Sequence, residues 1–435
     1  MFERLSENAL TQVLHLGLTQ QLKLKPIQER RLPDPIAGHA YALYLHVPFC
    51  ESLCPYCSFN RFLMNETQAR RYFDLLRQEM EMTAALGYQF NTLYIGGGTP
   101  TVLPEELAKT IDLARALFDI REVSCETNPN HLTADKLAHL AGRVDRLSVG
   151  IQSFDDGLLA KMNRLETLGN GRQLMADIAS AVGAVPVLNI DLIFNLPTQS
   201  EESLRRDLRM ALESGANQIT YYPLMAAPGT LHSMEKTMGV YSAGAEKAYY
   251  EIIYDMLSPH LPASSAWTFS EQSVSMIDEY IVDYGEHVGL GSGSFSYLDG
   301  TLYANSFSLS DYETMIHNKQ APLLGIHPYG RYQQMCYDFL MNFFGLEMAR
   351  AKFEQRFGLP IELALPIEMS FMLVNGGFDT YNREKVTLSR RGRYLMIVMM
   401  REFFSGVNLL REQARGVLKA CQQTSSPASV TLPVR

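Results

Sequence analysis

Three cysteines near residue 50 are the side chains of this chain best suited to chemistry. They occur as Cys50-Glu-Ser-Leu-Cys54-Pro-Tyr-Cys57, directly after a predicted strand that ends at His46-Val-Pro-Phe. Three thiolates on one short loop can bind three irons of a cubane 4Fe–4S cluster, which ordinarily takes four cysteines. The fourth iron then keeps an open position for a small ligand, like the open position of a catalytic metal site. The spacing therefore favours a cluster with one vacant corner.

Two other kinds of site compete with the cluster. The pair in Cys54-Pro-Tyr-Cys57 has the spacing of a glutaredoxin-like dithiol. A zinc site would want a second pair of Cys or His, and His131 and His139 do not have the usual spacing. The additional Cys50 favours the cluster, because a dithiol needs only two thiols.

A second segment that could contact a ligand is the glycine run Gly96-Gly97-Gly98-Thr99, which follows another predicted strand. Glycines let the backbone approach a ligand closely, and exposed N–H and C=O groups can then bind a zwitterion. An ordinary tight turn is the alternative. Asp191 lies inside the apolar run VLNIDLIF, where an acid is costly to bury without a partner, so a functional role is favoured.

The elements that must position these residues alternate between strand and helix. Six apolar runs between residues 40 and 230 predict strands, namely YALYLHV, NTLYIGGG, EVSCETN, DRLSVGIQ, VPVLNIDLIF and NQITYYPL. Amphipathic stretches between them predict helices at 67–86, 104–118, 133–140 and 200–214, with an irregular pair within 155–182. Strand–helix units in series imply a parallel α/β sheet, open or curled toward a barrel. Ligands bind such sheets at the carboxyl ends of the strands.

Five motifs in this order resemble one known family. They are LYLHVPFC, YIGGGTPT, RLSVGIQSF, NIDLIFNLP and the Pro-Gly-Thr at 228–230, and the cysteine loop has an aromatic residue before its last cysteine. Together they resemble the radical S-adenosylmethionine (SAM) superfamily, in the branch that contains oxygen-independent coproporphyrinogen III oxidase and a related haem chaperone. The resemblance is strong over 40–230 and weak over 285–420. It implies a partial (β/α)6 barrel followed by a smaller, mainly helical, winged-helix-like domain.

The resemblance also implies the cofactors and their contacts. SAM would bind the open iron through its amino and carboxylate groups, and one electron from the cluster would split it into methionine and a 5′-deoxyadenosyl radical. Metal ligands would be Cys50, Cys54 and Cys57. Residues at family SAM positions are Gly97, Gly98, Thr99, Glu126, Gln152, Arg164 and Asp191. An arginine can pair bidentately with the methionyl carboxylate, whereas a surface charge is the alternative for Arg164. Tyr44 and His46 suit a packing or supporting role at least as well as catalysis.

The subfamily stays open in the sequence. Phe59 stands where the oxidase has a further cysteine, which puts oxidative decarboxylation in doubt. The chaperone's His-Asn-x-x-Tyr-Trp segment has no match in MIDEYIVDYGEHVGLGSG. Gly289-Leu-Gly-Ser-Gly-Ser-Phe-Ser resembles a family segment near substrate or a second SAM, and it suits a structural turn equally well. The resemblance implies an enzyme acting on a tetrapyrrole with one or two SAM molecules and a flavodoxin- or ferredoxin-type electron donor. A haem carrier and a radical methyltransferase, including a haem-opening one, are the alternatives.

Composition limits the remaining possibilities. The 435 residues carry a net charge of −9, and no basic stripe long enough for nucleic acid is found. The densest basic cluster is Arg390, Arg391 and Arg393, which predicts a solvated face or a local anion contact. No apolar run reaches the ~18 residues of a membrane span, so we expect a cytoplasmic protein. Cys125, Cys336 and Cys421 are expected to be inert packing residues.

Length predicts several domains. We expect an N-terminal extension at 1–39, a radical SAM core at 40–235 and an extension with the glycine-rich segment at 236–330. A helical C-terminal domain at 331–420 and a flexible tail at 421–435 complete the prediction. Within the C-terminal domain a strand is expected at 385–388, and YLMIVMM is expected to be a buried helical segment.

Overall fold

The computed structural model describes residues 22–424, except 28, 40, 226–227 and 272–284. The predicted tail beyond 424, most of the predicted N-terminal extension and part of the MIDEYIVDYGEHVGLGSG region lie outside the described residues. The predicted domain boundaries stay predictions.

Six parallel strands form the centre of the molecule, and they follow one another in the sheet in chain order. They are β2 (Tyr41–Val47), β5 (Phe90–Gly97), β6 (Glu122–Thr127), β7 (Arg146–Gln152), β8 (Val187–Phe194) and β9 (Gln218–Pro223). Every residue of β2 is buried, as expected of a strand covered on both faces. The register aligns Leu45 with Ile95 and Ile95 with Cys125, so the carboxyl ends lie at one edge. The parallel α/β prediction is confirmed.

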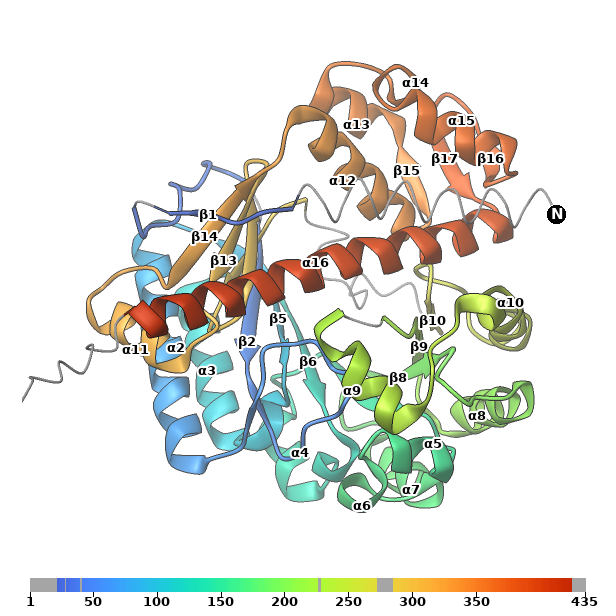
Figure 1. Cartoon of the computed structure of the whole chain (residues 1–435), viewed down its shortest axis with the longest axis horizontal. Coiled ribbons are helices and arrows are strands. Elements are labelled where there is room, and N and C mark those ends of the chain that lie inside the picture. Colours follow the sequence, from blue (N-terminus) through green and yellow to red (C-terminus); the bar gives the residue numbers. More distant parts are fainter. Residues whose placement is uncertain (1–21, 28, 40, 226–227, 272–284, 425–435) are drawn as a thin grey trace, which may run out of the picture.

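Helices cover this part of the sheet in the crossovers (Figure 1). They are α2 (Glu66–Ala85), α3 (Pro104–Leu117), α4 (Ala134–Leu140), α5 (Asp156–Lys161), α6 (Leu165–Leu168), α7 (Gly171–Ala181) and α8 (Glu201–Glu213). Ser200 and Ser203 form a capping box at the start of α8. The irregular pair expected within 155–182 is three short helices, because Asn163 and Gly169 adopt φ values of 59° and 97° that interrupt the helical path.

The sheet continues past both edges of these six strands into one mixed sheet of twelve strands. On the β2 side it adds β11 (His287–Leu290), β12 (Phe295–Leu298), β13 (Thr301–Asn305), β14 (Leu323–Pro328) and β1 (Lys25–Pro26). On the β9 side it adds the antiparallel β10 (Thr268–Ser270). The two outer strands, β1 and β10, do not pair with each other, so the barrel is partial and open.

A helical C-terminal region follows, as predicted (Figure 1). Its elements are α12 (Arg331–Phe344), β15 (Glu347–Ala349), α13 (Arg350–Phe357), α14 (Ile361–Ala364), α15 (Pro366–Val374), β16 (Phe378–Tyr381), β17 (Lys385–Leu388) and α16 (Arg390–Thr424). The three strands pair as a small antiparallel sheet, and β17 occupies the predicted range. The segment YLMIVMM at 394–400 is fully buried in α16, because its apolar side chains point all round the helix.

The long helix α16 joins the C-terminal region to the core by running across it (Figure 1). Arg401 on α16 makes a buried ion pair with Glu246 at the start of α10 (Glu246–Leu257). Further along, Gln413 donates a hydrogen bond of 2.9 Å to the carbonyl of Leu22.

Aromatic packing also closes this junction. Trp267, the single tryptophan of the chain, is fully buried. Its ring centroid lies 4.6 Å from that of Phe344 on α12 and 6.2 Å from that of Phe404 on α16.

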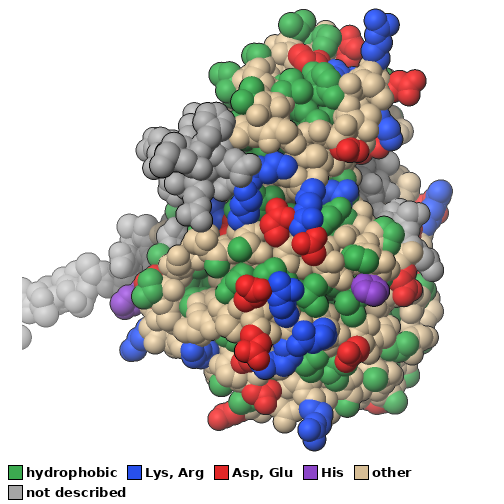
Figure 2. Space-filling view, turned by 90° about the vertical axis from the view of Figure 1, so that its right-hand side faces the viewer, with side chains coloured by type: hydrophobic (Ala, Val, Ile, Leu, Met, Phe, Trp, Pro, Cys, Tyr) green, Lys and Arg blue, Asp and Glu red, His purple; other side chains and the backbone are tan. Residues whose placement is uncertain are grey.

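On the face drawn in Figure 2, positively and negatively charged side chains lie next to one another. Within the predicted basic cluster, Arg390 pairs with Glu251 and with Asp255, the latter at 2.7 Å. Local anion contacts therefore account for part of this cluster. No helix in the described part of the chain is long and apolar enough to span a membrane.

Candidate functional site

A cavity of about 340 Å³ lies at the carboxyl ends of the parallel strands. Its wall contains every residue that the sequence predicted for the cluster and for SAM: Cys50, Cys54, Cys57, Gly97, Gly98, Thr99, Glu126, Gln152, Arg164 and Asp191. These residues come from six separate stretches of the chain. The parallel topology brings them together: most of them lie at or beyond the carboxyl end of a neighbouring strand, whereas Asp191 lies within β8 (Val187–Phe194).

The cysteine loop is held between the short parallel strands β3 (Phe49–Cys50) and β4 (Phe62–Leu63). Inside the loop, the Cys57 N–H donates to the Cys54 carbonyl at 3.3 Å. Arg61 donates to the carbonyls of Cys54 at 2.6 Å and Cys57 at 2.8 Å. Burial raises the pKa of the Cys50 thiol to about 12 and also raises the pKa of Cys57. A metal must therefore displace these protons when it binds.

Tyr44 and His46, two aromatic residues on the strand before the loop, form hydrogen bonds next to it. His46 is buried, and its ring nitrogens lie 2.8 Å from the Tyr44 hydroxyl and 2.9 Å from the Asn60 carbonyl oxygen. Burial lowers the pKa of His46 to about 4, so the ring is neutral near pH 7. These contacts agree with a supporting role.

The glycine run packs directly against the cysteine loop. Gly97 has φ of 115°, and a Cβ added there would lie 2.5 Å from the His46 ring. A Cβ on Gly98 would lie 2.6 Å from the Phe49 carbonyl oxygen. Glycine is thus required for this close approach. The N–H groups of Gly98 and Thr99 donate to the carbonyls of Val47 at 2.8 Å and Phe49 at 2.7 Å. To a ligand, the run can offer carbonyl acceptors, which suit an ammonium group.

Glu126 stands beside the same run. Its Oε2 accepts from the Gly97 N–H at 3.0 Å, and its Oε1 accepts from the Tyr94 hydroxyl at 3.0 Å. The carboxylate is therefore fixed at the carboxyl end of β6, on the wall of the cavity.

Arg164 lies deep in the cavity wall. It is 5% exposed, which excludes the surface-charge alternative. Its guanidinium donates to the Gly150 carbonyl and lies 3.4 Å from Asn128 Oδ1 and 3.6 Å from Cys54 Sγ. Its Nε is buried and has no hydrogen-bond partner among the described atoms. A buried cation with an open donor suits an anionic ligand group.

Gln152 and Asp191 complete the predicted set from β7 and β8. Gln152 ends β7 with φ of 72°, an uncommon conformation for a residue other than glycine. Asp191 accepts from Ser148 and from Asn189, each at 2.7 Å. These bonds supply the partners that a half-buried acid inside an apolar strand requires.

Comparison with known proteins shows which family has a similar sequence and fold. The family described as "Radical SAM superfamily" matches residues 44–211. The heme chaperone HemW of Bacillus subtilis is 29% identical over 374 residues, which cover 81% of this chain and 96% of the relative. The HemW of Lactococcus lactis is 30% identical over 274 residues, covering 60% of this chain and 71% of the relative.

The chain belongs to the radical SAM superfamily. Its relatives lie in the family of HemW and oxygen-independent coproporphyrinogen III oxidase. The solved structure of coproporphyrinogen III oxidase (HemN) from Escherichia coli matches 91% of this chain and 93% of its own with a TM-score of 0.70 at 21% identity. This match confirms the predicted radical SAM fold.

Members of the superfamily bind a 4Fe–4S cluster and SAM, and the residues of this radical SAM protein fit both groups. The donor set is three cysteines on one loop, and the described residues contain no three His, Cys, Asp or Glu side chains that converge on a single metal ion. A cubane instead distributes its cysteines over different irons. The open donor of Arg164 and the close backbone approach at Gly97 and Gly98 suit a zwitterion beside the loop.

Sequence reasoning missed several residues of this cavity. Asn128, directly after β6, donates to the Thr99 hydroxyl at 2.9 Å and so connects the glycine run to Arg164. Phe404, Asn408 and Arg411 enter from α16. Their spacing of four and three residues, which places side chains on one helix face, was a signal in the sequence.

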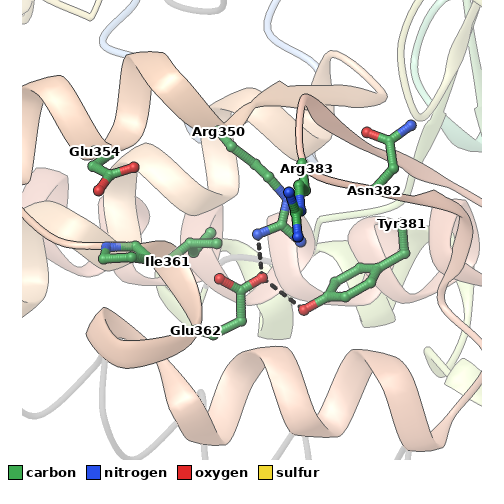
Figure 3. Close-up of a pocket in the computed structure, with 8 residues that line it drawn as sticks. Arg350, Glu354, Ile361, Glu362, Tyr381, Asn382 and Arg383 are labelled. Carbon is green, nitrogen blue, oxygen red and sulfur yellow. Dashed lines mark hydrogen bonds and ion pairs between the residues drawn. The ribbon is translucent and has the colours of Figure 1, made fainter.

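A second cavity lies in the C-terminal region between the β16–β17 hairpin and helices α13 and α14 (Figure 3). Glu362 accepts there from Arg350 and, at 2.6 Å, from the Tyr381 hydroxyl. Because this carboxylate is already paired and no predicted site residue lines the cavity, it has no part in the site described above.

Proposed function

We propose that this chain is a radical SAM enzyme that directs a 5′-deoxyadenosyl radical at haem or a closely related tetrapyrrole. The convergence of all predicted cluster and SAM residues on one cavity supports this proposal most strongly. The proposed location is the cytoplasm, where thiols stay reduced.

In this proposal Cys50, Cys54 and Cys57 hold the cluster. When bound and reduced by a flavodoxin- or ferredoxin-type donor, the cluster supplies the electron that splits SAM. Arg164 would hold the methionyl carboxylate through charge-assisted hydrogen bonds. The carbonyls of the run at 97–99 would receive the amino group. The remaining SAM residues, Glu126, Gln152 and Asp191, would orient the nucleoside part.

The proposed substrate class is based on the names of the relatives and on one position at which this sequence differs from the oxidase pattern. The matched relatives are named as a heme chaperone and as a coproporphyrinogen III oxidase, so a tetrapyrrole is common to both. Phe59 stands where the oxidase pattern has a further cysteine. We therefore favour haem or a haem-like ring over oxidative decarboxylation of coproporphyrinogen.

A haem carrier is the second candidate. The relatives aligned over most of this chain are named heme chaperone HemW, with 96% of the Bacillus subtilis protein covered. The lack of a His-Asn-x-x-Tyr-Trp match in the sequence favours the enzyme.

One anaerobic assay distinguishes the candidates. Cluster-reconstituted protein is incubated with dithionite, SAM and either haem or coproporphyrinogen III, and the products are separated by mass spectrometry. The enzyme predicts 5′-deoxyadenosine together with a changed haem. S-adenosylhomocysteine beside it would identify methyl transfer and two uses of SAM. Decarboxylated coproporphyrinogen would identify the oxidase.

If haem is bound tightly and recovered unchanged, the protein is a haem carrier and the proposed enzyme activity is contradicted. Protein that binds neither tetrapyrrole while it still cleaves SAM would contradict the proposed substrate class.

A further inference from the structure

The face of α16 that enters the cavity combines an aromatic ring with polar groups. Phe404, Asn408 and Arg411 all line the cavity. Asn408 accepts from the Arg411 guanidinium at 2.7 Å, so the amide oxygen orients this cation. The guanidinium carbon of Arg411 also lies 4.6 Å from the ring centroid of Phe59 on the cysteine loop. Arg411 is thus held between the helix and the loop.

Two more arginines, Arg415 and Arg61, contact the same loop through its backbone carbonyls. Arg415 donates to the carbonyls of Ser58 at 3.0 Å and Phe59 at 2.9 Å. Arg61 donates to the cysteine carbonyls, and its Nη1 is buried with no hydrogen-bond partner in the described part of the chain. Three guanidiniums therefore lie at this loop, and two of them, those of Arg61 and Arg411, line the cavity.

The rest of the cavity lining differs in chemistry. Its acids, Glu126 and Asp191, come from strands β6 and β8 and accept hydrogen bonds from neighbouring groups. The lining also contains flat or apolar side chains: Phe59, Ile193, Tyr222, Leu224, Met225, Phe295 and Phe404. Such side chains suit a broad apolar ring, and the guanidiniums of Arg61 and Arg411 suit an anionic group attached to that ring.

We infer that Arg411 binds a carboxylate of the tetrapyrrole's side chains, while Phe59 and Phe404 contact the macrocycle. This inference rests on the proposed function and adds the residue that selects for carboxylate-bearing rings. A guanidinium pairs with a carboxylate through two parallel hydrogen bonds, which fixes the orientation of the ring as well as its affinity. Of the three arginines, Arg411 is the one that lines the cavity from α16, whereas Arg61 lines it from the loop.

The test compares two ligands with the same macrocycle, one with ionised propionates and one with uncharged methyl esters in their place. Haem and its dimethyl ester, in which both propionates are esterified, are titrated by Soret absorbance into anaerobic, cluster-loaded protein with SAM present. The wild type should bind haem at least about tenfold more tightly than the ester. Arg411→Gln should remove this preference by weakening haem binding about tenfold or more while the ester's affinity stays the same. Arg411→Lys should keep part of the preference.

The matched control is Arg383→Gln, an exposed arginine on the β16–β17 hairpin that should behave like the wild type. Cluster absorbance and SAM affinity of each variant establish that the site is intact. Equal affinity of the wild type for haem and ester would overturn the inference, and this comparison needs no variant to fold. Equal weakening of both ligands by Arg411→Gln would also overturn it and would make Arg411 a structural support of the loop. Failure of the wild type to bind either ring would instead overturn the proposed function, and the inference with it.

Discussion

The three loop cysteines are the proposed ligands of the cluster. Cys50, Cys54 and Cys57 line the cavity, whereas Cys125 is buried within β6 away from it. Replacing any one loop cysteine by Ala should abolish all SAM cleavage. It should also abolish the brown absorbance at about 400 nm that is usual for 4Fe–4S clusters. Iron and sulfide analysis of anaerobically reconstituted protein measures the loss. Cys125→Ala should leave both largely intact, and an equal loss there would mean that the ligands are assigned wrongly.

Arg164 is the buried cation expected to bind SAM. Its Nε has no partner among the described atoms, although its Nη2 contacts both Gly150 and Asn128. Arg164→Ala should weaken SAM binding by about 1.5–3 kcal/mol, the usual range for a hydrogen bond to a charged group. Calorimetric titration of SAM measures the change. Arg121→Ala is the control, because Arg121 is exposed and pairs only locally with Asp119; unchanged SAM affinity in Arg164→Ala would leave this arginine a purely structural role.

The residues at the strand ends could be predicted from sequence because short motifs fix them locally. The glycine run and the cysteine spacing occupy continuous stretches, and the parallel sheet brings such stretches to one edge. Arg411 and Asn128 could not be placed in the same way. Arg411 lies 353 residues after Ser58 and reaches the cavity only because α16 packs across the core. The helical spacing of Phe404, Asn408 and Arg411 indicates a shared face, but it does not indicate which part of the molecule that face contacts.

At the scale of elements, Glu79 joins α2 to the glycine-rich segment after β11. Its Oε2 accepts from the Gly291 N–H at 2.7 Å and from the Tyr312 hydroxyl at 2.6 Å, and its Oε1 accepts from Asn305 at 3.1 Å. Burial raises the pKa of Glu79 to about 7 despite these hydrogen bonds. This network gives the segment at 289–293 a structural role, one of the two alternatives open in the sequence.

A raised carboxyl pKa means that the folded protein binds a proton more tightly than the unfolded chain. The free energy of unfolding should therefore fall as pH rises from about 4.5 to about 7, by about 3 kcal/mol in all. Glu79→Gln should flatten this part of the pH dependence. Urea unfolding at several pH values between 5 and 8 (about one unit apart) measures it. Glu81→Gln, an exposed site on the same helix, should keep the wild-type slope, and an unchanged slope in Glu79→Gln would contradict the assignment.

Some strands could be predicted from the sequence more accurately than others. The six parallel strands are continuous apolar runs, and their predicted ranges agree with the structure to within two residues at each end. Strands β12, β13 and β14 were missed, because runs such as Phe295–Leu298 and Thr301–Asn305 mix serine, threonine and asparagine with apolar residues. Their strand structure depends on pairing with β11 and with one another, which a local pattern does not contain.

For the whole molecule, α16 is the connection between the C-terminal region and the core. Arg401 pairs with Glu246 and with its neighbour Glu402, and all three side chains are nearly buried. Arg401→Met should lower the free energy of unfolding by about 3–5 kcal/mol, because it leaves buried acids without a counter-charge. Denaturant unfolding measures the loss. Arg401→Met combined with Glu246→Gln should recover part of it, and independent, additive losses would show that the pair is not coupled.

Trp267 lies directly behind the cavity wall, since its ring centroid is 5.3 Å from that of Tyr222 and 6.2 Å from that of Phe404, both of which line the cavity. The chain contains no other tryptophan. Its ultraviolet emission therefore comes from one known position at the junction of sheet, α12 and α16. A haem in the cavity would lie well within energy-transfer range and should extinguish this emission almost completely. If the proposed ligand binds there, this single tryptophan would report its occupancy without any label.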